Sequence, residues 1–267
     1  MISKAKKPMF LIMGVLNVTP DSFSDGGTIR SGAEAVAQAK RMASSGADII
    51  DVGAESTRPG ALSVSSEDEW ARLHPILLAL LDSGLMPSVS VDTRWGVNAL
   101  RALTFGVRMF NNVTGLYETD VLKQISATSG TRYIAMHMQG EPATMQESPM
   151  NREEALEKVP QFLQKSRDAL LINGFSSDRI FVDPGIGFGK SDEANLALIS
   201  QTSAMSRDGN IAIGISRKGF IGRLLNISEP KDRDDASKVL EMSLAMMGAQ
   251  LIRTHEVERL ARIRELL

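Results

Sequence analysis

The sequence alternates between short apolar runs and longer amphipathic segments about eight times. This alternation is typical of parallel strands joined by helices. Predicted strands cover residues 10–16, 49–52, 88–91, 109–110, 133–136, 180–182, 211–215 and 251–253. Predicted helices cover 33–45, 66–81, 97–104, 120–129, 152–173, 195–203, 236–247 and 257–267. This series predicts an α/β fold, a (β/α)8 TIM barrel in a single domain, with a doubly wound open sheet as the alternative.

The chain length also suits one barrel, because 267 residues is close to the roughly 250 that this fold needs. We expect a flexible N-terminus over residues 1–8, followed by one barrel domain over 9–267. Glycines follow six of the predicted helices, where a left-handed residue commonly ends a helix. They are Gly46, Gly84, Gly106, Gly130, Gly174 and Gly248.

Composition narrows the class of protein. The chain has no cysteine, which excludes disulfides and thiol nucleophiles and leads us to expect a cytoplasmic protein. Its formal charge of -2 gives no broad basic field, so we expect no nucleic-acid partner. The apolar runs are too short to span a bilayer, so we expect no membrane association.

The segment 180–190 reads IFVDPGIGFGK and predicts a strand followed by a binding loop. Pro184 cannot donate to a sheet ladder, so the strand ends there and Asp183 lies at its carboxyl end. Three glycines then leave room for a sharp turn or a nearby ligand. The spacing fits neither the Walker loop nor the dinucleotide fingerprint, and a plain glycine-rich loop is the alternative.

Polar residues follow every predicted strand. In chain order they are Asn17, Glu55, Thr57, Arg58, Asp92, Asn111, Asn112, His137, Asp183, Ser216, Arg217, Lys218, Arg253 and His255. Ligands bind at the carboxyl ends of the strands in both candidate folds, so these residues predict one site. The carboxylates Asp92 and Asp183 could hold the amino and N–H groups of a pterin-like or guanine-like ring. The alternative for Asp92 is to cap the next helix.

The cations near the last two predicted strands suit an anion, because these loops often hold phosphate in barrels. The long loop after the first strand contains Phe23 and is either a lid or a connector.

Six motifs in this order resemble the dihydropteroate synthase family. They are MGVLNVTPDSFSDGG at 13–27, DVGAESTRPG at 51–60, SVDT at 90–93, MHMQG at 136–140, DPGIGFGK at 183–190 and SRK at 216–218. The likeness continues to RTH at 253–255 and so covers almost the whole chain. It implies a TIM-barrel transferase of folate biosynthesis, which joins 4-aminobenzoate to 6-hydroxymethyl-7,8-dihydropterin pyrophosphate and releases pyrophosphate.

The resemblance also implies roles for individual residues. The residues that would hold the pterin are Asp92, Asn111, Met136, Asp183 and Lys218. Arg253 would stack on the ring and, with His255 and Asn17, hold the pyrophosphate. The residues that would border the aminobenzoate are Thr57, Arg58, Pro59, Phe188 and Ser216, and Phe23 would belong to a lid. Asp92, Asp183, Lys218 and Arg253 would be the catalytic residues.

Mg²⁺ is the expected cofactor, shared between Asn17 and the substrate pyrophosphate, because this ion binds through few protein ligands plus phosphate oxygens. The resemblance further implies a homodimer and sensitivity to sulfonamides. Three positions depart from the commoner family residues. Asn112 replaces an Asp, which would remove a charge near the pocket rim, and Thr254 and Glu256 replace Val and Asp. Two rivals stay open: a pterin-binding methyltransferase of the same superfamily and a pterin-binding homologue without activity.

Overall fold

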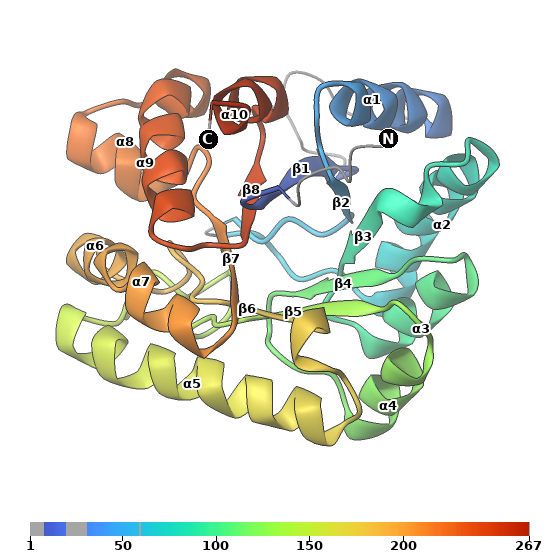
Figure 1. Cartoon of the computed structure of the whole chain (residues 1–267), viewed down its shortest axis with the longest axis horizontal. Helices are drawn as coiled ribbons and strands as arrows, with labels where there is room; N and C mark the ends of the chain where they lie inside the picture. The colour runs from blue at the N-terminus through green and yellow to red at the C-terminus, as the bar shows by residue number, and fades with distance from the viewer. Residues whose placement is uncertain (1–7, 20–30, 59, 267) are drawn as a thin grey trace, which may run out of the picture.

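The described part of the chain forms a closed barrel of eight parallel strands in chain order, surrounded by helices (Figure 1). It is a computed structural model that describes residues 8–19, 31–58 and 60–266. The last strand pairs with the first, Leu11 opposite Leu251, which closes the sheet. This closure confirms the TIM barrel and excludes the open sheet. The expected flexible N-terminus falls on residues 1–7, outside the described residues, and on Pro8.

The strands are β1 (Leu11–Asn17), β2 (Ile49–Gly53), β3 (Val89–Asp92), β4 (Met109–Asn112), β5 (Arg132–Met136), β6 (Ile180–Asp183), β7 (Asn210–Gly214) and β8 (Leu251–Thr254). The helices are α1 (Gly32–Ser44), α2 (Ser66–Asp82), α3 (Gly96–Thr104), α4 (Thr119–Ala127), α5 (Arg152–Ile172), α6 (Asp192–Ser200), α7 (Thr202–Met205), α8 (Gly219–Leu225), α9 (Asp234–Met246) and α10 (Val257–Arg264). Four short 3-10 turns are η2 (Met86–Ser88), η3 (Ser177–Arg179), η4 (Ser206–Asp208) and η5 (Pro230–Arg233).

One predicted helix needs correction, and one helix was not predicted. The helix predicted over 195–203 begins earlier, because Ser191 caps α6 by accepting the backbone N–H of Ala194, and it is followed by the separate α7. Helix α8 was missed because its seven residues are too few to show a periodic pattern.

Helix ends follow the sequence signals closely. Gly46, Gly84, Gly106, Gly174 and Gly248 lie two residues beyond a helix and have φ between 76° and 99°, so they end their helices as predicted. Gly130 also has a positive φ, but it lies beyond Thr128, which caps α4.

Two apolar layers build the core. Met13, Ile49, Met109, Ile134, Phe181, Ala212 and Leu251 form a cluster inside the barrel. A larger cluster, which includes Ile50 and Val52, fills the space between strands and helices. Successive residues of a strand face opposite sides, so Asp51 shares the interior side with Ile49. The polar residues at the carboxyl ends of the strands therefore lie next to this interior apolar cluster.

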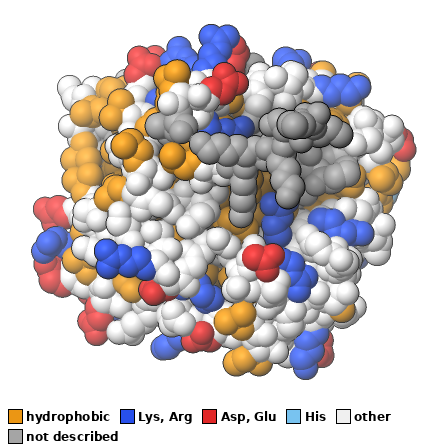
Figure 2. All heavy atoms as spheres, in the orientation of Figure 1, with side chains coloured by type: hydrophobic (Ala, Val, Ile, Leu, Met, Phe, Trp, Pro, Cys, Tyr) orange, Lys and Arg blue, Asp and Glu red, His pale blue; other side chains and the backbone are white. Residues whose placement is uncertain are grey.

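The surface carries mixed charges. Figure 2 shows basic and acidic side chains interspersed on the drawn face. Hydrophobic side chains gather over α8 and α9, where Leu224, Leu225, Val239 and Met246 are exposed (Figure 2). Within the described ranges, no helix combines the length and apolar character that a membrane crossing requires.

Candidate active site

A cavity opens at the carboxyl ends of the strands. The space between its walls, including the part open to solvent at the mouth, is about 450 Å³. Its walls are formed by Val15, Thr57, Asp92, Asn111, Val113, Met136, Asp183, Phe188, Gly214, Ser216, Lys218, Arg253 and His255. Ten of these residues were predicted from the sequence, and the structure therefore brings most of the predicted site together.

Arg253 joins two carboxylates across the cavity. Its Nε donates to Asp51 Oδ2 at 2.7 Å, and its Nη2 donates to Asp92 Oδ2 at 3.2 Å. Asn111 also donates to Asp51, with 3.0 Å between Nδ2 and Oδ2. Asp51 is fully buried and its Oδ1 has no hydrogen-bond partner among the described residues. The result is a cluster of two acids, one cation and one amide.

Asp51 was not predicted as a site residue. It stands inside β2, whereas the predicted polar site residues follow the predicted strands. A carboxylate within the apolar run IIDVG was the available signal, because buried charges need partners.

Asp92 belongs to the cavity and not to a helix end. Trp95 is the N-cap of α3 and no side chain caps that helix, so the capping alternative is wrong. Burial and the nearby charge of Asp51 together raise the pKa of Asp92 to about 8, although Arg253 works against this shift. A ligand that donates hydrogen bonds to Asp92 would favour its charged form.

Asp183 and Lys218 face the same cavity from β6 and from the turn before α8. Burial raises the pKa of Asp183, and the charge of Lys218 works against that shift. Burial also lowers the pKa of Lys218 to about 7, although Asp183 favours its ammonium form. The Lys218 ammonium contacts the carbonyl oxygen of Ile186 and lies 4.3 Å from the centre of the Phe188 ring.

The glycine-rich loop after β6 is shaped by close backbone contacts. Asp183 accepts the backbone N–H of Gly185 at 2.7 Å. A Cβ at Gly185 would overlap the carbonyl oxygen of His137, and its φ of 63° also favours glycine. The glycines therefore allow the loop to pack against the end of β5, with Phe188 turned into the cavity.

Lys190 binds the backbone of this loop, a role that was not predicted from the sequence. Its side chain is fully buried, and Nζ donates to the carbonyl oxygens of Gly185 at 2.9 Å and Phe188 at 3.0 Å. The third contact is with His137 Nδ1 at 3.0 Å. Burial lowers the pKa of Lys190 to about 7, while the acceptors around Nζ, which also include the carbonyl oxygen of His137 at 3.4 Å, favour the ammonium form.

His137 does not line the cavity, although the sequence places it among the polar residues that follow the strands and predict the site. Its ring is buried between Lys190 and the edge of Phe162, with 5.0 Å between the ring centres of His137 and Phe162. Burial, together with the neighbouring charge of Lys190, lowers its pKa to about 3. The neutral imidazole therefore contacts Lys190 and, through it, supports the glycine-rich loop after β6.

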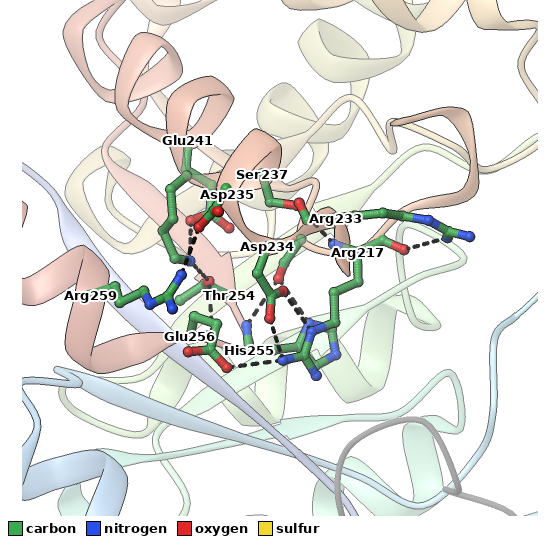
Figure 3. Close-up of polar contacts among 12 residues, drawn as sticks. Arg217, Arg233, Asp234, Asp235, Ser237, Glu241, Thr254, His255, Glu256 and Arg259 are labelled. Carbon is green, nitrogen blue, oxygen red and sulfur yellow. Dashed lines mark hydrogen bonds and ion pairs between the residues drawn. The ribbon is translucent and has the colours of Figure 1, made fainter. Parts of the chain in front are cut away.

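Ser216 and His255 meet at the ends of β7 and β8. The backbone N–H of His255 donates to Ser216 Oγ at 3.2 Å, and His255 Nδ1 lies 2.9 Å from the same oxygen. Arg217, between the two cavity residues Ser216 and Lys218, turns away from the cavity toward Asp234 and Glu256 (Figure 3).

The loop after β2 brings only part of its predicted residues to the cavity. Thr57 lines the wall, but Arg58 is exposed and does not. Glu55 anchors the loop by accepting the backbone N–H of Val64 and pairing with Arg94, both at 3.0 Å. Phe23 and Pro59 lie outside the described residues, and so does most of the first loop.

Asn112 is not at the pocket rim, so the predicted loss of charge there is wrong. Neighbouring strand residues face opposite sides, and Asn111 takes the cavity side. Asn112 is buried toward the helices, where its Nδ2 donates to the Tyr133 hydroxyl at 3.1 Å and its Oδ1 accepts the backbone N–H of Thr114 at 2.9 Å. The replacement of Asp by Asn at this position therefore concerns the packing between β4 and the helices and not the cavity.

Asn17 stands at the end of β1 and does not line the cavity wall, but it neighbours it. A Cβ on Gly53 would lie 3.6 Å from Asp92 Oδ2 and 3.8 Å from Asn17 Oδ1, so a glycine keeps the space between these oxygens open. Hard oxygen donors of this kind fit Mg²⁺ that is also bound by phosphate. The described residues contain no cluster of three or more His, Cys, Asp or Glu that could hold a metal alone.

The fold and this cavity agree with known proteins. Residues 13–255 match the family described as pterin binding enzyme. A dihydropteroate synthase of Synechocystis sp. is 39% identical over 254 residues, which cover 94% of this chain and 87% of that protein. The mitochondrial folate synthesis bifunctional protein of Pisum sativum is 39% identical over 93% of this chain, which spans 51% of the pea protein.

Two solved structures are similar throughout. The Yersinia pestis dihydropteroate synthase, in complex with a sulfonamide drug, has a TM-score of 0.85 at 35% identity and covers 96% of this chain and 94% of its own. The Xanthomonas albilineans dihydropteroate synthase with 4-aminobenzoic acid has a TM-score of 0.85 at 33% identity, covering 96% and 91%. The chain therefore belongs to the family of pterin-binding enzymes. Within that family it groups with the dihydropteroate synthases.

Proposed function

We propose that this protein catalyses the dihydropteroate synthase reaction. The enzyme is a transferase of folate biosynthesis that joins 6-hydroxymethyl-7,8-dihydropterin pyrophosphate to 4-aminobenzoate and forms 7,8-dihydropteroate and pyrophosphate. The observation that carries this proposal is the convergence of Asp92, Asp183, Lys218 and Arg253 on one cavity, in a chain of this family. The cavity presents carboxylates that can accept hydrogen bonds from a pterin ring, and beside them cationic side chains that can bind the pyrophosphate.

The two carboxylates and one amide are assigned to the pterin ring. Asp183 and Asp92 accept from its amino and ring N–H groups, and Asn111 and Lys218 complete the polar contacts. Met136 forms an apolar wall beside them. Buried carboxylates need donors that match them, so a ring edge rich in N–H groups is favoured over an apolar ligand.

The chemistry requires the cavity to stabilise charge. The bond between the pterin methylene carbon and the pyrophosphate oxygen breaks first, and the remaining cation spreads into the ring. Asp92 and Asp183 stabilise this cation, while Arg253 and His255 hold the departing pyrophosphate. The amine of 4-aminobenzoate then attacks the methylene carbon and loses a proton. Preorganised groups of this kind commonly supply the largest part of catalysis.

The second substrate is assigned to the mouth of the cavity. Thr57, Phe188 and Ser216 lie together there, on loops from three different strands. Arg58 is exposed on the same loop as Thr57 and is assigned to the carboxylate of 4-aminobenzoate as that loop closes. Pro59 and the lid residue Phe23 are assigned from the family resemblance alone.

Asn17 is assigned to the pyrophosphate end and to Mg²⁺. When bound, Mg²⁺ would neutralise part of the negative charge on the pyrophosphate. Asn17 would supply one oxygen ligand, and the open space beside Gly53 gives the phosphate oxygens access to it.

The remaining assignments concern the molecule as a whole. We assign residues 9–267 to the functional barrel and the protein to the cytoplasm. A homodimer is supported by the exposed hydrophobic side chains of α8 and α9, because a second copy would cover them (Figure 2). Light scattering of the purified protein measures this directly.

The experiment that tests the proposed function is a coupled pyrophosphate-release assay with both substrates. Release that depends on 4-aminobenzoate, with 7,8-dihydropteroate as the product, supports it. A pterin-binding methyltransferase would need no 4-aminobenzoate, and an inactive homologue would bind the pterin without turnover. Either result would overturn the proposal.

A further inference from the structure

We propose that Arg217 is a positioning residue that sets the cavity groups Ser216, Lys218 and His255 relative to one another. The inference rests on the roles proposed above for these three residues. Arg217 itself does not line the cavity. Figure 3 shows its contacts with Asp234 and Glu256.

The backbone of Arg217 is in the left-handed region. Its φ is 61°, and in the described part of the chain only Asn226 among the other non-glycine residues shares a positive value. Such a conformation is unfavourable for a residue with a Cβ and persists only where the surroundings enforce it. Here it changes the chain direction between Ser216 and Lys218, so that both neighbours face the cavity.

The surroundings that enforce this turn are polar and specific. Arg217 donates to both carboxylate oxygens of Asp234, from Nε at 2.8 Å and from Nη2 at 2.9 Å. Its backbone N–H donates to Ser237 Oγ at 3.2 Å, and its carbonyl oxygen accepts from Arg233 Nη1 at 3.1 Å. Helix α9 and the turn before it therefore grip both the side chain and the main chain of Arg217 (Figure 3).

A further contact connects this turn to the end of β8. Arg217 Nη2 donates to Glu256 Oε1 at 2.9 Å, and Glu256 directly follows His255. The side chains of Arg217 and Asp234 are 9% and 15% exposed, so water screens this ion pair less than a surface pair. One side chain thus ties the loop that presents Lys218 to the loop that presents His255. Glu256, which stands where Asp is commoner in the family, is thus paired with Arg217.

The test compares Arg217→Gly, Arg217→Ala and Asp234→Asn with Asp235→Asn. Glycine accepts the left-handed backbone but removes the ion pairs, so it isolates the side chain. Asp234→Asn removes the charge that pairs with Arg217 but does not change the identity of Arg217 or of any residue that lines the cavity. Asp235→Asn is the matched control, because Asp235 is the next residue of α9 and its exposed pair with Arg259 does not touch the turn (Figure 3).

We expect kcat/KM for the pterin pyrophosphate to fall about 10- to 100-fold in Arg217→Gly, Arg217→Ala and Asp234→Asn, because small misplacements of binding groups have effects of this size. The dissociation constants of 6-hydroxymethylpterin and of pyrophosphate should both rise, and Asp235→Asn should leave all three quantities unchanged. The double variant of Arg217→Ala and Asp234→Asn should be no worse than Arg217→Ala alone, because both changes break one interaction.

A merely structural role would lower the melting temperature of the variants and leave the ligand affinities of the folded protein unchanged. That result, or equal losses in Asp235→Asn, would overturn the inference. If Arg217→Ala does not fold, the kcat/KM and the dissociation constants of Asp234→Asn still test the inference. Lack of turnover by the unaltered enzyme would contradict the proposed function, whereas the binding constants of the variants would still decide on Arg217.

Discussion

Arg253 donates from Nε to Asp51 Oδ2 at 2.7 Å and so joins the last strand of the barrel to the second strand beneath the cavity. The same guanidinium reaches Asp92, which the chain places on the third strand. A buried acid that pairs with a cavity cation belongs to the electrostatics of the site, although it does not line the wall.

We predict that Asp51→Asn lowers kcat/KM by about 10²-fold, because Arg253 loses a charged partner and its position over the cavity. Steady-state kinetics with both substrates measure this. Asp48→Asn is the control, because Asp48 precedes the same strand at the opposite end of the barrel and pairs with Arg264. It should lower the free energy of unfolding without changing turnover. Equal kinetic losses in both variants would contradict the role of Asp51.

Asp183→Ala and Lys218→Ala should each abolish measurable pteroate formation while the protein stays folded. Each change removes one group that the cavity offers to the pterin, a loss of about 10²- to 10³-fold in rate. Product formation is measured by chromatography, and circular dichroism checks the fold. Arg223→Ala is a control on α8, because its pair with Asp192 is remote from the cavity wall. Near-normal turnover in either cavity variant would refute the assignment.

The pH dependence of kcat/KM should be bell-shaped, with its maximum between about pH 7 and 8. Lys218, whose pKa is lowered to about 7, loses its charge as pH rises through that value, so activity falls on the alkaline side. Asp92, whose pKa is raised to about 8, gains its charge as pH rises, so activity falls on the acid side. Lys218→Arg should flatten only the alkaline limb. A profile that is level from about pH 6 to about pH 9 would contradict both roles.

Lys190→Met should lower the free energy of unfolding by about 1–3 kcal/mol for each carbonyl left unpaired, because buried acceptors need donors. The pH dependence should change as well. The pKa of Lys190 is about 7 in the folded protein and 10.5 without the fold, so the unfolded chain binds the extra proton in between. This residue therefore stabilises less as pH falls toward 7, and the variant should show a shallower rise of stability with pH. Urea unfolding at several pH values measures it.

Lys165→Met is the control for that experiment, because Lys165 is exposed on α5. It should leave stability and its pH dependence unchanged. A Lys190→Met protein as stable as this control would show that the buried ammonium is not needed to hold the loop.

Sulfonamides should inhibit the enzyme in competition with 4-aminobenzoate, because Thr57, Phe188 and Ser216 leave one place for either molecule. Inhibition constants measured at several concentrations of 4-aminobenzoate check this. Pterin binding should be unaffected, since it uses Asp183 and Lys218. Full activity at saturating sulfonamide would contradict the assigned substrate position.

Much of this protein could be predicted from sequence because the signals are local. Period-two apolar runs and cap residues depend on neighbours in the chain, so the strands and most helices were placed within a few residues. Residues directly after strands, such as Asp183 and Lys218, were predictable for the same reason: a barrel brings all strand ends to one face. Helix α8 was not predicted because about two turns are too short to show a periodic pattern.

Only the tertiary structure decided which partners the polar residues have. Asp51 and Arg253 are 202 residues apart in the sequence and meet because β2 and β8 both pair with β1, a relation that no local pattern encodes. Asn111 and Asn112 look alike in sequence, yet the strand turns one to the cavity and the other to the helices. The conformation of Arg217 likewise depends on α9. The sequence by itself determined the order of elements and the inventory of cavity groups, because these follow from local propensity. The closure of the barrel determined the charges that face one another, because burial and pairing depend on distances between strands.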